Sequence, residues 1–219
     1  MVRKEQVALS HKVDSTKLLE WARSLQAIAQ SGLAWEPSQY DGERYEQVRR
    51  IAAEMLADRG QLSADGVEGL FASQYGHATP KVDVRGAVFR GDAILLVEEA
   101  SDLGWSLPGG WADVGESPRE AVEREVLEES GYGVRAVKLI GLYERDRRAT
   151  RPHVWHIWKV AFLCELEGGE QLPLGAETTD ARFCARDELP RLRYSRASEW
   201  QIERCFAHHD DPTLPTEFD

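Results

Sequence analysis

Long hydrophobic runs are missing from this chain of 219 residues. Its longest apolar stretches, such as residues 93–97, are far shorter than the roughly 20 residues that a helix needs to cross a bilayer. The opening sequence MVRKEQVALSHKVDS has no apolar segment followed by small residues, so no signal peptide is predicted. The chain also has no internal repeat and no low-complexity segment. Its length suits one ample domain or a domain with an appendage.

Positive charge is outnumbered, because 27 lysines and arginines stand against 38 aspartates and glutamates, and the formal net charge is -11. This balance argues against duplex nucleic acid or an anionic membrane as the main partner. An anionic substrate would need a local basic group or a bridging cation.

Cysteine is scarce, with only Cys164, Cys184 and Cys205 scattered along the chain. Their spacing fits neither a metal site nor a disulfide framework. The sequence therefore predicts buried free thiols and a cytoplasmic location.

Two helical patterns come first. Apolar residues recur at helical spacing over residues 18–29, with Asp14 or Ser15 as the N-cap and Gly32 as the stop. A second stripe predicts a helix over residues 45–60. Two amphipathic helices bury little by themselves, so their apolar faces are expected to meet the rest of the chain or a second subunit.

From Lys81 the apolar period becomes that of strands. Residues 81–90 and 93–99 predict two strands joined by a tight turn at Gly91 and Asp92. Residues 64–80 are expected to form a short helical or irregular linker, and residues 101–110 a loop. Further strands are predicted over residues 134–145, 153–167 and 181–190. A closing helix is predicted over residues 198–209, followed by a loose tail at residues 210–219.

An acidic helix lies between these strands. Ser117 is a good N-cap, Pro118 suits the first helical position, Glu120 completes a capping box, and Gly131 fits the position just past the end. With about 100° of rotation per residue, Glu125, Glu128 and Glu129 share an arc of about 100°. Val122 and Val126 lie beside this arc and are expected to pack on the sheet.

Such crowded carboxylates have two interpretations. They could form a solvated face paired with Arg119 and Arg124, as runs of charge usually do. They could also supply the converging hard oxygens that Mg²⁺ or Mn²⁺ requires.

The spacing favours the metal interpretation. From Gly110 to Tyr132 the sequence fits G-x5-E-x7-R-E-U-x-E-E-x-G-U at every position, where U is a bulky apolar residue. This pattern resembles the signature of the Nudix hydrolases without departure, and WSLPGG resembles the usual lead-in. The resemblance implies an α/β protein with an α/β/α sandwich and a mixed sheet. The Nudix domain would cover residues 79–219, after a small all-helical domain at residues 1–78.

The family resemblance also implies residue roles. Nudix hydrolases cleave a nucleoside diphosphate linked to another group, X. Glu125, Glu128 and Glu129 would bind Mg²⁺ or Mn²⁺ together with the backbone carbonyl of Gly110. Glu116 and Arg124 would hold the loop and the helix together as an ion pair.

The general base is left open by the sequence. In this family it often lies on a later loop, where Glu177 is the first candidate and Asp180 the second. Glu128 could serve instead, and for either loop carboxylate a solvated position is an equally good interpretation.

Substrate contacts are predicted on two segments. The basic loop with Arg145, Arg147, Arg148 and Arg151 could grip a phosphate or the X group, or could be a solubilising turn. Trp105 and Trp111 could stack on a base or ribose, or could pack in the core or loops. His153 and His156 are expected to be structural residues of a strand, and the HHDD stretch at 208–211 a solvated turn.

The helical leader narrows the resemblance further. It resembles the bacterial Nudix group with an N-terminal helical domain, which includes CDP-choline pyrophosphatases and ADP-ribose pyrophosphatase-like proteins. The leading hypothesis is hydrolysis of CDP-choline to CMP and phosphocholine by a homodimer whose leader walls part of the pocket. ADP-ribose cleavage to AMP and ribose 5-phosphate is the alternative. An oxidised-dGTP pyrophosphohydrolase and a non-catalytic ligand sensor are lesser ones.

Overall fold

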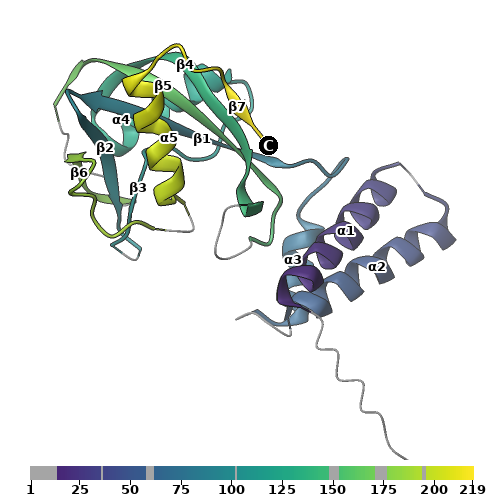
Figure 1. Cartoon of the computed structure of the whole chain (residues 1–219). Coiled ribbons are helices and arrows are strands. Elements are labelled where there is room, and N and C mark those ends of the chain that lie inside the picture. Colours follow the sequence, from purple (N-terminus) through teal and green to yellow (C-terminus); the bar gives the residue numbers. More distant parts are fainter. Residues whose placement is uncertain are drawn as a thin grey trace, which may run out of the picture. The chain divides into compact units, whose positions relative to one another are not determined.

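A computed structural model gives the fold, and it describes residues 14–35, 37–57, 62–101, 103–147, 153–170, 177–193 and 196–219. The chain divides into two compact units, residues 1–79 and 80–219. Figure 1 shows the first unit as helices and the second as a sheet with helices. In the part of the chain that is described, no helix is long and apolar enough to span a membrane.

The first unit contains three helices, α1 (Ser15–Ala34), α2 (Gln39–Ala57) and α3 (Ala64–Ala72). Asp14 caps α1 as predicted, its carboxylate accepting a hydrogen bond from the Thr16 amide. Gly32 does not end the helix, contrary to the sequence prediction. A Cβ at this position would lie 2.4 Å from the ring of Tyr45, so the glycine makes room for α2 to pack closely on α1.

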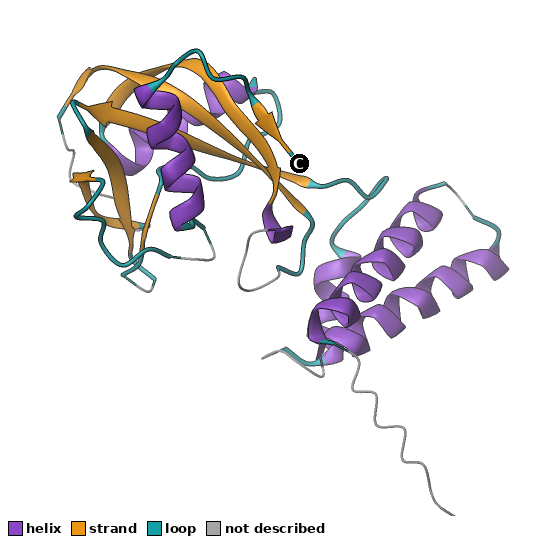
Figure 2. Cartoon of the chain, viewed as in Figure 1, coloured by secondary structure: helices purple, strands orange, loops and turns teal. Residues whose placement is uncertain are grey.

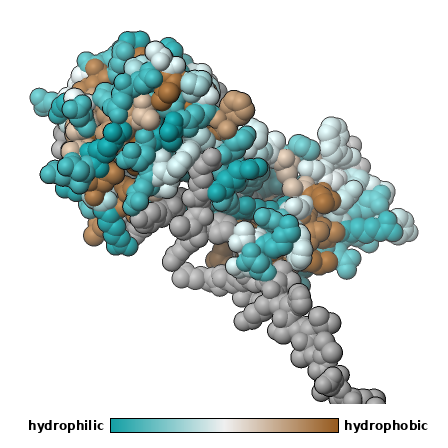
Figure 3. Space-filling view, viewed as in Figure 1, coloured by the Kyte–Doolittle hydropathy of each residue, from teal (hydrophilic) through white to brown (hydrophobic). Residues whose placement is uncertain are grey.

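Several large apolar side chains of this unit are exposed. Trp21 and Ile28 lie one heptad apart on the same face of α1 and are 45% and 56% exposed. Ile51 of α2 and Leu70 of α3 are also exposed. Figure 3 shows apolar side chains grouped on the surface of the helical unit. A face of this kind is typical of a protein interface.

The second unit is built on a mixed sheet. Its strands are β1 (Lys81–Arg90), β2 (Ala93–Glu99), β3 (Trp105–Ser106), β4 (Tyr132–Glu144), β5 (Ile157–Gly169), β6 (Thr178–Ala185) and β7 (Glu217–Phe218). They follow the order β3-β2-β1-β5-β4-β7, and β6 pairs with the outer side of β2. The pair β1–β5 is parallel and the pair β4–β5 antiparallel.

The two halves of β1 have different neighbours. Its C-terminal end forms the predicted hairpin with β2, through Phe89–Ile94 and Arg90–Ala93. Along its N-terminal half, the segment after β3 takes the place of β2. The amide of Val84 donates to the carbonyl of Gly110 at 2.8 Å, and Gly86 donates to Pro108 at 2.9 Å. The PGG segment is therefore fixed along β1.

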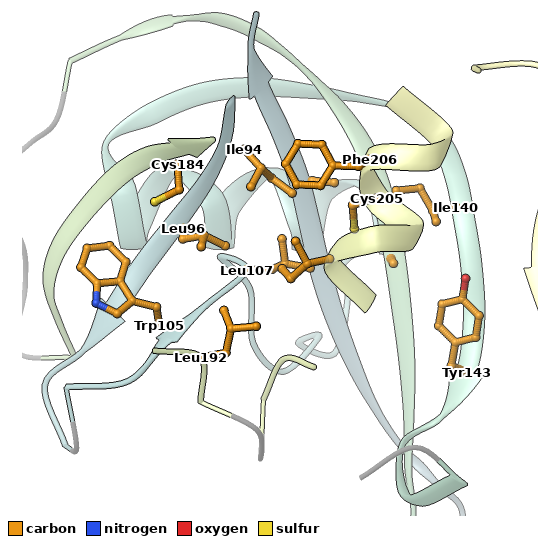
Figure 4. Packing of buried hydrophobic residues seen from close by; sticks show 13 residues of the cluster. Ile94, Leu96, Trp105, Leu107, Ile140, Tyr143, Cys184, Leu192, Cys205 and Phe206 are labelled. Atoms are coloured by element: carbon orange, nitrogen blue, oxygen red, sulfur yellow. The ribbon is translucent and has the colours of Figure 1, made fainter. Parts of the chain in front are cut away.

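Helices cover both faces of this sheet (Figure 2). On one face, α4 (Pro118–Ser130) buries Val122 and Val126 against β1 and β2. On the other face, α5 (Glu199–Asp210) buries Ile202 and Phe206, and Figure 4 shows Phe206 beside Ile94 in this cluster. The predicted α/β/α sandwich is confirmed. The three cysteines are buried and free, as predicted.

The C-terminal tail is ordered, which the sequence analysis did not predict. Glu217 and Phe218 form β7, which pairs in parallel with β4. His208, expected in a solvated turn, is fully buried and lies 3.3 Å from Glu217 through its Nε2. His209 stacks on Phe89 with ring centroids 3.9 Å apart. Contacts distant in sequence give this segment its structure.

Strand β3 was also missed, because its two residues lie in a segment rich in loop-forming residues. Trp105 and Ser106 pair with Glu98 and Val97 of β2. Trp105 is 5% exposed and belongs to the core beneath α5, so packing is its role.

Candidate active site

A cavity of about 790 Å³ opens in the second unit, beside the N-terminal half of β1. The predicted residues among its lining are Gly110, Trp111, Glu125, Glu128, Glu129, Arg145 and Glu177. They come from the PGG segment, α4, the turn after β4 and the start of β6. The fold thus gathers residues from four parts of the chain at one cavity.

The acidic helix has the predicted ends. The hydroxyl of Ser117 accepts from the Glu120 amide at 3.3 Å, and the Glu120 carboxylate accepts from the Ser117 amide at 2.8 Å. Gly131 ends the helix with a φ of +78°, a conformation that favours glycine. These local contacts fix the register of α4 and hence the direction of its glutamates.

Glu129 is the most enclosed of the three glutamates. The residue is 6% exposed, and its Oε2 accepts a hydrogen bond from the Gly109 amide at 2.8 Å. Burial raises the pKa of Glu129 to about 7, although Arg85 favours the charged form. An ionised carboxylate at this position calls for a nearby cation.

Glu125 lies directly against the PGG segment. A Cβ at Gly110 would come within 2.7 Å of Glu125 Oε2, so a side chain at this position would displace the carboxylate from where it lies. Burial raises the pKa of Glu125, opposed by Arg124. The Gly110 carbonyl accepts the Val84 amide, and a carbonyl oxygen has a second lone pair.

Arg124 connects the acidic groups. Its Nε and Nη2 donate to the two carboxylate oxygens of Glu116 at 2.7 and 3.0 Å. Its Nη1 contacts Glu125 Oε1 at 2.9 Å and Glu128 Oε2 at 3.0 Å. The hydrogen bonds from Arg124 hold the pKa of Glu116 below its usual range. Among the described side chains, no three acids, histidines or cysteines already enclose a point where a metal ion would fit.

The other predicted residues divide between the cavity and its surroundings. Trp111 is 45% exposed at the cavity, and Arg145 is buried there with Asp146 Oδ1 2.5 Å from its Nη1. Arg147 is exposed and does not line the cavity. Arg148 and Arg151 lie outside the described residues.

Of the two loop carboxylates considered as general base, Glu177 lines the cavity. Its carbonyl accepts the Ala100 amide at 2.9 Å, which fixes the backbone at this point. Asp180 pairs with Glu98 in the β2–β6 ladder and is not among the lining residues.

Sequence reasoning missed a buried ion pair on β1. Asp83 accepts two hydrogen bonds from Arg85, at 2.8 and 2.9 Å, and both residues line the cavity. Burial opposes ionisation of Asp83, yet Arg85 and Lys159 hold its pKa below the usual range. Two charged residues at alternate positions of an apolar strand point to the same face, a signal that was available in KVDVRGAVF.

Six further lining residues were missed: Asp113, His153, Ile157, Thr178, Arg193 and Arg196. His153 was placed on a strand, but it precedes β5 and lies at the cavity. His156, treated alike, also precedes the strand, and its side chain is 49% exposed. The arginines lie between β6 and α5, where the sequence has no motif. Their position depends on how that segment returns across the sheet.

Comparison with known proteins decides the family. Residues 79–205, more than half of the chain, match the family described as NUDIX domain. The chain belongs to the Nudix hydrolase family. Residues 16–71 of this Nudix hydrolase match a second family, described as "UDP-X-like, N-terminal oligomerisation domain".

Two relatives match along nearly the whole chain, and a third matches along about two thirds of it. A Bacillus subtilis (strain 168) protein named "Putative ADP-ribose pyrophosphatase YjhB" is 40% identical over 204 residues, covering 93% of this chain and 98% of that protein. A crystal structure of UDP-X diphosphatase is 28% identical with a TM-score of 0.60, covering 94% of this chain and all of the other. An ADP-ribose pyrophosphatase from Streptococcus suis 89-1591 is 38% identical with a TM-score of 0.59, covering 64% of this Nudix hydrolase and all of that chain.

Proposed function

We propose that this Nudix hydrolase cleaves the pyrophosphate bond of a nucleoside diphosphate linked to X, with Mg²⁺ or Mn²⁺ held by Glu125, Glu128, Glu129 and the Gly110 carbonyl. The observation that carries the proposal is the convergence of three glutamates on one cavity. The donor set fits such an ion, because all of its atoms are hard oxygens, Glu129 is buried and Glu125 is partly buried. When bound, the ion would neutralise pyrophosphate charge, orient a water and lower the pKa of that water.

The remaining residues would position these ligands and move a proton. Glu116 and Arg124 would aim Glu125 and Glu128, since Arg124 contacts all three carboxylates. Glu177 would take a proton from the attacking water, because it lies at the cavity and Asp180 does not. Glu128, whose side chain is 59% exposed, is the alternative base.

ADP-ribose is the first candidate substrate, giving AMP and ribose 5-phosphate. Two relatives of this chain carry names that include ADP-ribose pyrophosphatase. CDP-choline, which the motif context favoured, is the second candidate and would give CMP and phosphocholine. Oxidised dGTP is less favoured because of the helical unit, and the sensor is less favoured because the signature is intact.

The protein would act as a homodimer joined through its helical unit. Support comes from the family described as an oligomerisation domain at residues 16–71 and from the exposed apolar residues of α1. The cytoplasmic location stays a prediction from the free cysteines.

The test is product analysis with Mg²⁺ on ADP-ribose, CDP-choline and 8-oxo-dGTP, for the wild type and for Glu129→Gln. Loss of one buried metal ligand is expected to lower kcat/KM by about 100-fold or more. Glu123→Gln is the matched control on the same helix, because Glu123 does not line the cavity and an amide oxygen still accepts from the Ala136 amide. Its activity should match the wild type.

Two results would contradict the proposal. Equal loss in both variants would remove the special role of Glu129. Binding of a substrate without turnover, in wild-type protein that binds Mg²⁺ by calorimetry, would favour the sensor.

A further inference from the structure

The cavity is divided by charge. Three of its lining glutamates, Glu125, Glu128 and Glu129, come from α4, which covers one face of the sheet, and Glu177 precedes β6. Arg193 and Arg196 come from the segment leading into α5, which covers the other face. Arg145, after β4, and Arg85 of β1 add two more guanidinium groups to the lining. The substrate would therefore meet carboxylates on one side and guanidinium groups on the other.

One buried carboxylate holds two of these arginines. Glu99, at the end of β2, is 3% exposed. Its Oε1 lies 2.7 Å from Arg196 Nη1, and its Oε2 lies 3.3 Å from Arg193 Nη1. The Ser106 hydroxyl donates to Glu99 Oε1 at 3.3 Å and fixes the carboxylate further. Glu99 thus positions both guanidinium groups at the cavity.

The same sharing occurs at the floor of the cavity. Asp83 forms the two hydrogen bonds with Arg85 and also lies 3.9 Å from Lys159 Nζ. Lys159 is buried, and Arg85, Arg145 and Arg196 are all close enough to disfavour its charged form. Two buried carboxylates are thus each shared by two basic side chains, and Asp146 pairs with Arg145. The side of the cavity away from α4 presents guanidinium groups whose positions are fixed by carboxylates.

We propose that Arg145, Arg193 and Arg196 form a cationic wall that binds an X group offering oxygen acceptors, such as a sugar or its phosphate, and rejects a quaternary ammonium. This inference rests on the proposed function. Guanidinium groups donate to hydroxyl and phosphate oxygens, and choline offers no acceptor beyond its phosphate ester. A cationic X group is instead bound by aromatic rings, and Trp111 contributes the one indole or phenyl ring among the described lining residues.

Two small phosphate esters test the wall without metal or turnover. Glycerol 3-phosphate carries a neutral polyol and phosphocholine a quaternary ammonium, while the phosphate is common to both. Dissociation constants would be measured by calorimetry in EDTA on the full chain. Like-charge contact is expected to make phosphocholine bind at least about tenfold more weakly.

Variants assign the selectivity to the wall. Arg196→Gln and Arg193→Gln are each expected to reduce the ratio of the two dissociation constants to below about threefold, and Arg196→Lys to keep it, because the lysine keeps the charge. Arg135→Gln is the control, since Arg135 also pairs with carboxylates but does not line the cavity. Thermal unfolding would verify that each variant is folded. If a Gln variant does not fold, Arg196→Lys still allows the two esters to be compared with a changed side chain in the wall.

Equal binding of the two esters, tighter binding of phosphocholine, or no binding of either at millimolar concentration would overturn the wall. The proposed function fails separately. If selectivity appears but no nucleotide is hydrolysed, the wall stands and the activity is wrong. If nucleotides are hydrolysed but the esters bind equally, the activity stands and the wall is wrong.

Discussion

The lowered pKa of Lys159, beside the cavity, should make the free energy of unfolding depend on pH. The residue is 3% exposed, and burial lowers the pKa of its ammonium group from 10.5 to about 7. Between these two values the unfolded chain holds a proton on Lys159 that the folded protein has released. The free energy of unfolding should therefore rise with pH from about 7 towards 10, by at most about 1.4 kcal/mol per pH unit from this group.

Urea unfolding of the wild type and of Lys159→Met at pH 7, 8 and 9 measures this contribution. The variant is expected to be more stable at pH 7 and to show a smaller slope with pH. Lys138→Met, which removes a lysine hydrogen-bonded to the Pro212 carbonyl, should leave the slope unchanged. Identical slopes for wild type and Lys159→Met would show that the pKa of Lys159 is not lowered in the folded protein.

Single residues also show how far the sequence could predict the site. Glu125, Glu128 and Glu129 could be placed together because three- and four-residue spacing on a helix fixes their direction. Arg193 and Arg196 could not, because their place at the cavity depends on Glu99, nearly a hundred positions earlier in the chain. No local pattern encodes such a contact. The metal-binding role of the glutamates stays a prediction.

Among the elements, α4 and β7 are opposite cases. The ends of α4 were predicted because its capping box and Gly131 act within a few residues. The tail that forms β7 reads as loose, because its structure comes from β4 and α5. Glu217 carries much of this contact. It accepts from Tyr143 at 3.1 Å, pairs with Arg204 and contacts the buried His208.

Glu217→Ala should therefore destabilise the protein. The variant leaves Tyr143, Arg204 and His208 without this acceptor, and the expected loss is about 2 kcal/mol in the free energy of unfolding. The loss would be measured from urea midpoints. Glu203→Ala is the control on α5, because Glu203 is half-exposed and 3.6 Å from Arg186, and its effect should stay within about 0.5 kcal/mol. Similar losses in both variants would mean that β7 does not fasten the tail.

At the scale of the whole molecule, the helical unit should decide the oligomeric state. Light scattering on the full chain is expected to give the mass of a dimer, about twice 24.7 kDa. Ile28→Glu, which places a charge on the exposed apolar face of α1, should shift the protein to monomers with unchanged helix content. Gln39→Glu adds the same charge at an exposed position of α2 and should remain dimeric. A monomeric wild type would refute the dimer.

The division of the cavity between α4 and the segment before α5 has an evolutionary consequence. The glutamates are fixed by a capped helix packed on the sheet, and under the proposed function a change there would abolish the reaction. The arginines stand on a connection outside the helices and strands, held by one carboxylate. Under the proposed role of the cationic wall, substitutions in that connection would alter which X group is accepted while the chemistry persists. Descendants of one ancestral enzyme could thus acquire new substrates by small steps, each of them an active hydrolase.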